Sequence, residues 1–291
     1  MRDDALRELV RTRAEEPERL AVTAAARRRR PLLTARGRLM LIAADHPARG
    51  AFSVGGRPMA MADRIDLLDR MLLALSRPGV DGVLGTPDLI DDLLLLGALD
   101  DKVVIGSMNR GGIPGTAFEI DDRFTAYSAN ALVAGNLDGG KMLLRIDPTD
   151  KASAATLEGC SNAINELAAN RLMAMVEPFW VRRDEAGRAI NDLSPDAVVR
   201  SIAIAQGLGT TSAYTWLKVP VVAEMERVLS ASTLPALLLG GDPGEAPEET
   251  YASWQKALRL PTVRGLVVGR TLLYPPDDDV ATAVDTAVSL L

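Results

Sequence analysis

The 291-residue sequence has few of the residues on which several common kinds of site depend. Its one cysteine, Cys160, excludes an internal disulfide and is typical of a reducing compartment. Its one histidine, His46, is too few for a zinc site with two or three histidine ligands. Although His46 follows Asp45, no Gly-x-Ser-x-Gly motif supplies a serine nucleophile. A magnesium site built from carboxylates stays open, with Asp45, Asp147 and Glu177 as its candidates.

Long apolar runs are also absent. The longest, such as the run around residues 93–96, fall far short of the ~20 residues that a membrane span needs. Residues 1–30 are polar and rich in arginine, and they lack the charged-then-apolar pattern of an export signal. The net charge of -6 does not favour binding to nucleic acid. We therefore expect a cytoplasmic protein that binds neither membranes nor nucleic acid.

Basic residues are concentrated at the start of the chain. Residues 1–38 contain 11 arginines against six acidic residues, and the remainder is correspondingly acidic. This segment is either an arm that docks on an acidic body or a solvated helix with a tail, and we favour the solvated tail. Two further hypotheses are a plug under the floor of the following domain and an oligomer contact. We expect the chain to form a homo-oligomer.

From about residue 39, short apolar runs alternate with segments of helix length. Eight such pairs predict an α/β fold, a (β/α)8 TIM barrel over residues 39–291 with a helical N-terminal extension over residues 1–38. A doubly wound sheet is the alternative, but the turn after the first strand lacks a glycine-rich fingerprint. The expected strands are residues 39–45, 80–84, 102–107, 139–146, 172–177, 214–220, 235–240 and 264–269. The expected helices are residues 60–77, 87–98, 149–169, 194–208, 221–231, 247–260 and 277–290.

One connection is unusually long. Residues 108–134, between the third and fourth strands, are rich in glycine, asparagine and arginine. Loops of this length at the mouth of a barrel are often lids over a site, and an ordinary surface excursion is the alternative.

Lysine is scarce, because the 33 basic residues comprise 28 arginines and only five lysines. One of the five, Lys218, lies in the middle of an apolar run, residues 214–222 (YTWLKVPVV), that reads as a buried strand. A buried amine is either paired or used in chemistry, because burial disfavours its charged form. A neutral lysine can form a Schiff base with a carbonyl group, whereas an arginine cannot.

Charged residues recur at the strand ends where barrel enzymes place their chemistry. Asp45 ends the first strand, and strand alternation turns Glu177 and Lys218 inward on the fifth and sixth. The same alternation on the fourth strand turns inward the charged residues Lys141, Arg145 and Asp147. Any single pair among these could be a buried ion pair that only ties strands together. Four charged strands meeting at one face favour a functional site, because each buried charge costs desolvation.

The last two strands indicate a phosphate site. Gly240 and Gly241 end the seventh strand, and Gly269 and Arg270 end the eighth. Exposed backbone amides after these two strands recur as a phosphate cradle in such barrels, and arginine adds a fork for phosphate oxygens. Glycine pairs also occur simply as turns, so the indication depends on the barrel assignment.

With these residues placed, the sequence over about residues 39–275 resembles the class I aldolases of the DeoC/LacD type, including tagatose-bisphosphate aldolase. Residues 216–221 (WLKVPV) look like the strand that carries the family's Schiff-base lysine. Residues 138–147 (DGGKMLLRID) and 175–178 (MVEP) are similar to its fourth and fifth strands. Asp45 with Arg49 and Gly50, and Gly269 with Arg270, match its acidic residue and its phosphate side. Pro47 and the long third loop depart from the family. The chain is most similar to a subgroup of high-GC bacteria associated with sugar and inositol breakdown.

The resemblance implies a Schiff-base-forming, metal-independent aldolase without a cofactor. Its substrate would be a phosphorylated sugar, a ketose phosphate, with the deoxy-keto-gluconate phosphate of inositol catabolism as one candidate. Lys218 would be the nucleophile, with Lys141 as a like-charged neighbour that favours its neutral form. Glu177 would shuttle protons, and Asp45 would deprotonate the substrate hydroxyl. Substrate binding would fall to Arg145, Gly240, Gly241, Gly269 and Arg270. The alternatives are a transaldolase or sugar-phosphate isomerase that uses the same lysine, and a non-catalytic barrel that binds a sugar phosphate.

Overall fold

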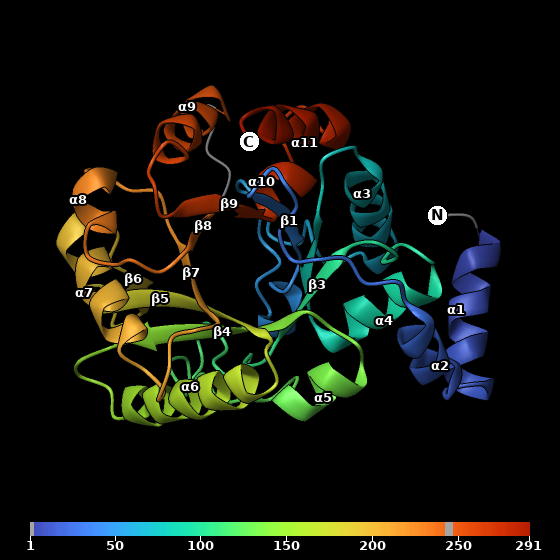
Figure 1. Cartoon of the computed structure of the whole chain (residues 1–291), viewed down its shortest axis with the longest axis horizontal. Coiled ribbons are helices and arrows are strands. Elements are labelled where there is room, and N and C mark those ends of the chain that lie inside the picture. Colours follow the sequence, from blue (N-terminus) through green and yellow to red (C-terminus); the bar gives the residue numbers. More distant parts are fainter. Residues whose placement is uncertain (1–2, 242–246) are drawn as a thin grey trace.

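The computed structural model describes residues 3–241 and 247–291. Within them, eight parallel strands close into a barrel, which confirms the predicted TIM-barrel fold (Figure 1). Closure is complete because β1 pairs with both β2 and β9, and β4 pairs with β5. The barrel strands are β1 (Leu39–Ala43), β2 (Gly82–Gly85), β3 (Val103–Ser107), β4 (Gly139–Ile146), β5 (Met173–Arg183), β7 (Thr215–Val219), β8 (Ala236–Leu239) and β9 (Val263–Val268).

Helices surround the barrel, and each of the seven helices predicted from the sequence is present but shorter than expected (Figure 1). The helix α5 was not predicted; it lies at the end of the long segment after β3. None of the helices in the described part of the chain combines the length and apolarity needed to span a bilayer. The helices after β1 are α3 (Arg64–Ser76), α4 (Pro87–Leu95), α5 (Ala129–Ala134), α6 (Ala152–Ala169), α7 (Pro195–Gln206), α8 (Met225–Leu229), α9 (Pro247–Ala257), α10 (Arg270–Leu273) and α11 (Val280–Ser289), with a short 3-10 turn, η1 (Pro47–Arg49).

The strands read as continuous apolar runs because both of their faces are buried. Met40 and Ile42 of β1 face outward into the core shared with the helices. Leu39, Leu41 and Ala43 of the same strand face the barrel interior. Parallel strands covered on both sides require apolar residues at every position, so a charged residue on an inner face stands out against them.

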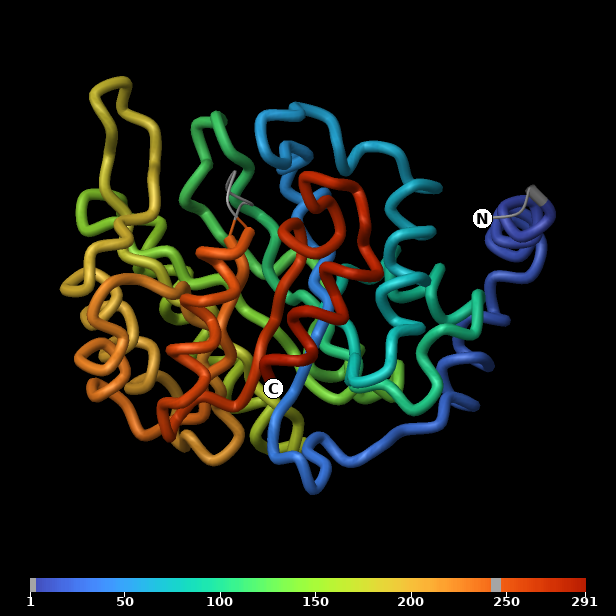
Figure 2. Tube along the Cα trace, turned by 90° about the horizontal axis from the view of Figure 1, so that it is seen from above, coloured from blue at the N-terminus to red at the C-terminus, as the bar shows by residue number. Residues whose placement is uncertain are grey.

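β5 is longer than the strand predicted at residues 172–177. It continues to Arg183 and turns back into the antiparallel strand β6 (Ala189–Asn191), with Val181 opposite Asn191. The turn between them is held by Asp184, whose side chain accepts a hydrogen bond from the backbone N–H of Arg188 at 2.8 Å. Figure 2 shows this hairpin, in yellow, projecting beyond the body of the barrel. It carries residues 189–193 to the same end as the loops that follow the strands.

The N-terminal segment packs against the barrel, so its interpretation as a solvated tail is wrong. The helices α1 (Asp3–Glu15) and α2 (Arg19–Ala26) lie beside α4, where Arg13 pairs with Asp92 at 2.6 Å (Figure 1). Residues 27–38 then run along the end of the barrel at which the strands begin (Figure 2).

Arginines of this basic segment form ion pairs with buried carboxylates of the barrel. Arg27 pairs with Asp138 at 3.1 Å, and Arg30 pairs with Asp81 at 2.7 Å. Leu32 and Leu33 pack against the apolar cluster inside the barrel. The charge asymmetry of the sequence therefore reflects docking, and the segment after the helices covers the barrel floor.

Candidate active site

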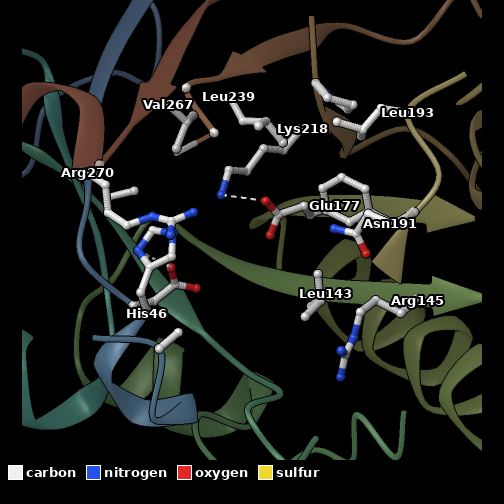
Figure 3. Close-up of a pocket in the computed structure, with 18 of the residues that line it drawn as sticks. His46, Leu143, Arg145, Glu177, Asn191, Leu193, Lys218, Leu239, Val267 and Arg270 are labelled. Atoms are coloured by element: carbon white, nitrogen blue, oxygen red, sulfur yellow. Dashed lines mark ion pairs between the residues drawn. The ribbon is translucent and has the colours of Figure 1, made fainter. Parts of the chain in front are cut away.

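A cavity of about 830 Å3 opens at the end of the barrel where the loops that follow the strands gather. Side chains from the inner faces of β4, β5 and β7 form its base, and residues after β1, β3, β8 and β9 form its walls. The hairpin of β5 and β6 adds Asn191 and Leu193 to the rim (Figure 3). The cavity brings together all nine site residues predicted from the sequence: Asp45, Lys141, Arg145, Glu177, Lys218, Gly240, Gly241, Gly269 and Arg270.

Lys218 lies near the C-terminal end of β7 and is only 3% exposed. Its neighbours Leu217 and Val219 face the outer core, so strand alternation turns the lysine into the barrel. Its Nζ lies 2.8 Å from Oε1 of Glu177, which reaches across from the adjacent strand β5 (Figure 3). The buried amine of Lys218 is thus paired, and its side chain lines the cavity.

Glu177 lies between the two lysines. Its Oε2 atom is 2.5 Å from the Nζ of Lys141, so the carboxylate separates two amines that the sequence suggested were direct neighbours. Burial alone would raise the pKa of Glu177, but Lys141 and Lys218 outweigh burial and hold its pKa below the ordinary value. Glu177 is therefore ionised at neutral pH and stabilises positive charge on both sides.

Lys141 is the more enclosed of the two lysines, at 1% exposure. Burial lowers its pKa, and the like charge of Lys218 acts in the same direction, although Asp45 and Glu177 oppose the shift. Its Nζ also lies 3.0 Å from Oδ2 of Asp45. Lys218, Glu177, Lys141 and Asp45 thus form a continuous row of side chains whose charges alternate in sign.

Asp45 follows β1, and two hydrogen-bond donors and one further cation converge on a single oxygen of its carboxylate. Its Oδ2 lies 3.0 Å from Lys141 Nζ, 3.0 Å from Arg110 Nη1 and 3.2 Å from Ser107 Oγ. Burial would raise the pKa of Asp45, yet the charges of Arg110 and Lys141 hold it well below the ordinary value.

His46 lines the cavity beside Asp45, at the mouth of the barrel. Its Nδ1 lies 4.0 Å from Oδ1 of Asp45, too far for a hydrogen bond. Burial lowers the pKa of His46 to about 3, and the nearby charges of Arg270 and Lys218 add to the effect against that of Asp45. The imidazole is therefore neutral over the physiological pH range.

On β4, the alternation argument holds for Arg145 and is wrong for Asp147. Arg145 lines the cavity, and its guanidinium donates two hydrogen bonds of 2.7 Å to the carboxylate of Asp122. Asp147 follows the last residue of the strand, where alternation no longer applies. Its side chain accepts from the backbone N–H of Thr149 at 2.9 Å and pairs with Arg183 at 2.7 Å, away from the cavity.

The glycines after β8 and β9 leave the wall of the cavity bare of side chains. A Cβ at Gly269 would lie 2.3 Å from the carbonyl oxygen of Ala43 and 3.1 Å from Cε1 of His46, so only glycine fits there. Gly241 has a φ of 71°, in the left-handed region that favours glycine. Arg270 extends along this wall beside His46 (Figure 3). The arrangement suits an anion at this side of the cavity.

Two cavity arginines, Arg49 and Arg110, were not predicted as site residues. Arg110 lies in the long segment after β3, for which the sequence predicts either a lid or a surface loop. That segment is fastened to β4, because Asn109 accepts a hydrogen bond from the N–H of Leu143 at 2.7 Å and donates to the carbonyl of Leu143 at 2.6 Å. No local feature of the sequence singles out Arg110 within this segment.

The carboxylates proposed as magnesium ligands are not grouped together in the described residues. Within the described residues, no three histidine, cysteine, aspartate or glutamate side chains are grouped as a metal site. Of the three candidate carboxylates, Asp45 and Glu177 are paired with lysine and Asp147 with Arg183.

The sequence and fold of the chain were compared with those of known proteins. No curated protein matches it. Among solved structures, an archaeal fructose 1,6-bisphosphate aldolase is 18% identical over 93% of this chain and 98% of that chain, with a TM-score of 0.67. A fructose-bisphosphate aldolase from Slackia heliotrinireducens is 16% identical over 87% and 85%, with a TM-score of 0.61. At these identities the likeness shows a shared barrel fold.

A much nearer likeness exists. The crystal structure of Cgl0159 from Corynebacterium glutamicum (Brevibacterium flavum) is 56% identical and covers 100% of this chain and 97% of that chain, with a TM-score of 0.97. The model of the Cgl0159-like family matches residues 37–288, which include the whole barrel. On both grounds, the chain belongs to the Cgl0159-like family.

Proposed function

We propose that the protein is a class I aldolase of the DeoC/LacD type in which Lys218 forms a Schiff base with a ketose phosphate. The observation that carries the proposal is the contact of 2.8 Å between the buried amine of Lys218 and Glu177 at the base of the cavity. An amine and a carboxylate in contact are the two groups that Schiff-base formation needs, a nucleophile and a proton carrier. The barrel of a Schiff-base-forming fructose-1,6-bisphosphate aldolase, 18% identical to this chain, supports the same reading.

In the first step, Glu177 takes the proton of the Lys218 ammonium, and the free amine attacks the substrate ketone to give a carbinolamine. The nitrogen of the carbinolamine is neutral, so one of the two cations that hold the pKa of Glu177 down is lost. Glu177 therefore binds its proton more strongly at the step where it must carry one. It then gives that proton to the departing hydroxyl, which leaves as water and produces the iminium.

The iminium draws electrons from the neighbouring carbon–carbon bond. Cleavage requires a base at the hydroxyl that becomes the aldehyde, and Asp45 is our candidate through Oδ1, because the donors on Asp45 converge on Oδ2. Lys141 holds both Asp45 and Glu177 in place. The bare wall of Gly240, Gly241 and Gly269 with Arg270 would hold the phosphate of the ketone half.

Trapping with borohydride tests the proposal. Incubation with dihydroxyacetone phosphate and borohydride should attach one three-carbon phosphate to Lys218, located by peptide mass spectrometry. Lys218→Met should remove the adduct while thermal unfolding and circular dichroism stay close to the wild type. Lys256→Met, at a lysine whose side chain is 76% exposed, is the matched control and should label normally.

Three outcomes would contradict the proposal. They are an adduct confined to Lys141, the absence of any adduct with a panel of ketose phosphates, and activity that requires added zinc and is lost with a chelator. Saturable binding without an adduct would instead indicate a non-catalytic barrel. A retro-aldol screen should then cover ketohexose bisphosphates, sulfonated sugar phosphates and deoxy-keto-gluconate phosphate, the last of which we propose as a candidate substrate.

A further inference from the structure

The hairpin of β5 and β6 supplies cavity residues to which the proposed chemistry gives no role. Asn191, the last residue of β6, and Leu193, two residues further on, both line the cavity at its rim (Figure 3). Leu193 is 52% exposed, although its side chain is large and apolar. Asn191 is also exposed, and within the described residues nothing forms a hydrogen bond with its side-chain amide. Both side chains are therefore free to contact a ligand.

The backbone of this rim is held on both sides. Before Leu193, the backbone N–H of Asp192 donates to the carbonyl of Trp180 at 2.8 Å. After it, Ser194 caps the helix α7, and its own N–H donates to Oδ1 of Asp192 at 2.9 Å. The hydrogen bonds that hold residues 191–193 thus form without a ligand, so a ligand that binds there pays little for ordering the chain.

Asn191 and Leu193 lie on the far side of the nucleophile from the phosphate wall. Figure 3 shows Arg270 on one side of the Lys218–Glu177 pair and the two rim residues on the other. In a ketose with its phosphate on the ketone half, the carbonyl carbon separates the phosphate from the half that leaves as the aldehyde. A substrate bonded to Lys218, with its phosphate at Arg270, therefore extends its leaving half toward Asn191 and Leu193.

The hairpin can recognise a ligand through hydrogen bonding and apolar contact but not through charge. Its cavity residues are Ala189, Asn191 and Leu193, none of which is charged. Leu143 and Phe179, on β4 and β5, give the same cavity further apolar surface. A carbon chain gains affinity by covering such surface. A primary amide both donates and accepts hydrogen bonds, so it can bind a hydroxyl group in either sense.

We propose that Asn191 and Leu193 determine which aldehyde the enzyme releases or takes up. The amide of Asn191 forms a hydrogen bond with a hydroxyl oxygen of the leaving half, and the side chain of Leu193 packs on its carbon atoms. This inference rests on the proposed function, because the place of the leaving half follows from a Schiff base at Lys218. Asn191 thus discriminates between aldehydes by their oxygen atoms, whereas Leu193 contributes affinity to any of them.

Three aldehydes of equal length test the inference in the condensation direction. Propanal has no hydroxyl group, lactaldehyde has one at C2 and 3-hydroxypropanal has one at C3. Each is offered with saturating dihydroxyacetone phosphate, and kcat/KM for the aldehyde is measured from the phosphorylated product by mass spectrometry. The wild type should use at least one hydroxyaldehyde about tenfold or more efficiently than propanal, as expected of a new hydrogen bond. The preferred isomer shows which carbon carries the oxygen that Asn191 binds.

Asn191→Ala should remove the preference for the hydroxyaldehyde, and Asn191→Gln, which retains the amide, should keep part of it. Leu193→Ala should lower kcat/KM about three- to tenfold for all three aldehydes, because each loses apolar contact, and Leu193→Met should restore most of it. Glu185→Gln is the matched control on the hairpin, because Glu185 is exposed at its turn and lies outside the cavity. Leu73→Ala, at a leucine 42% exposed on α3, controls for the loss of apolar surface. Both controls should behave as the wild type.

All of these residues are exposed, so the variants should fold, which thermal unfolding checks. Equal use of the three aldehydes by the wild type, a preference that survives in Asn191→Ala, or losses as large in the two controls would overturn the inference. So would a wild type that forms the borohydride adduct on Lys218 but joins none of the aldehydes to it. The absence of that adduct would instead overturn the proposed function, so trapping tells the two failures apart.

Discussion

The Nζ of Lys218 lies 2.8 Å from Oε1 of Glu177. Because the other oxygen of the same carboxylate contacts Lys141, a single negative charge serves two buried amines. Burying an unpaired charge costs far more than a surface pair contributes, so this carboxylate supports the barrel as well as its chemistry. Stability and activity should therefore respond together to its removal.

Glu177→Gln tests this double role. The amide keeps the shape of the side chain but cannot carry a proton between Lys218 and the substrate, so turnover should fall about 10²- to 10⁴-fold. The free energy of unfolding should fall by about 3–5 kcal/mol, because Lys218 loses its buried counter-charge and Lys141 keeps only that of Asp45. Borohydride-trapping rates measure the first effect, and equilibrium urea unfolding measures the second.

A second variant separates pairing from simple packing. In a Lys141→Met background only one amine depends on Glu177, so Glu177→Gln should destabilise that background less than it destabilises the wild type. The folded-state pKa of Glu177 is depressed, so the stability it contributes is present above an ordinary carboxyl pKa of about 4.3 and is lost as the pH falls below it. Equal destabilisation in both backgrounds would show that the stability contributed by Glu177 does not depend on its ion pair with Lys141.

His46 should not titrate in the physiological range. As the only histidine, it gives a single imidazole signal by NMR, and with its pKa lowered to about 3 this signal should stay constant between pH 8 and pH 5. The chain unfolded in urea should titrate near 6.5 and serves as the control. Because the folded pKa is depressed, stability should decline as the pH falls below about 6.5, and His46→Gln should reduce that decline. A folded-state midpoint between pH 5 and 7 would contradict the burial argument.

Periodicity predicted the barrel and its charged inner face because both are local properties of the strands. The side chains of Glu177 and Lys218 point inward as strand alternation predicts, because both residues lie within strands, β5 and β7. Asp147 lies one residue beyond the end of β4, so alternation does not fix the direction of its side chain. Alternation reports on strand interiors and cannot locate where a strand ends. The extension of β5 into a hairpin was missed for the same reason.

Pairings between residues far apart in the chain could not be predicted from the sequence. Nothing local distinguishes Arg110 from Arg123, the other arginine of its loop, and its place in the site depends on Asp45, 65 residues earlier in the chain. The basic N-terminal segment looked like a solvated tail because its partners, such as Asp138, are scattered through the barrel. Compositional asymmetry indicated excess charge but could not show where that charge would be neutralised.

Arg270→Gln should separate phosphate recognition from Schiff-base chemistry. The variant loses a guanidinium fork from the glycine wall, so KM for phosphorylated ketones should rise about tenfold or more. The adduct on Lys218 should still form at saturating dihydroxyacetone phosphate, because the proposed chemistry assigns the nucleophile and the proton carrier to Lys218 and Glu177. Trapping with unphosphorylated dihydroxyacetone is the internal control and should proceed at the wild-type rate. A defect of equal size with both ketones would argue against a phosphate site at this wall.

The docking of the N-terminal segment should stabilise the barrel chiefly through Asp81. This buried carboxylate accepts from the backbone N–H of Met40 at 2.7 Å and pairs with Arg30 at 2.7 Å and with Arg36. Asp81→Asn should lower the free energy of unfolding by about 1–3 kcal/mol, because the partly exposed guanidinium groups of Arg30 and Arg36 lose their counter-charge at a buried carboxylate. The control is Asp101→Asn, at a carboxylate 62% exposed that pairs with Arg28, and its effect should be far smaller. Urea unfolding at low and high salt distinguishes them, since salt screens only the exposed pair. Equal losses in the two variants would show that the segment is not anchored by its buried carboxylates.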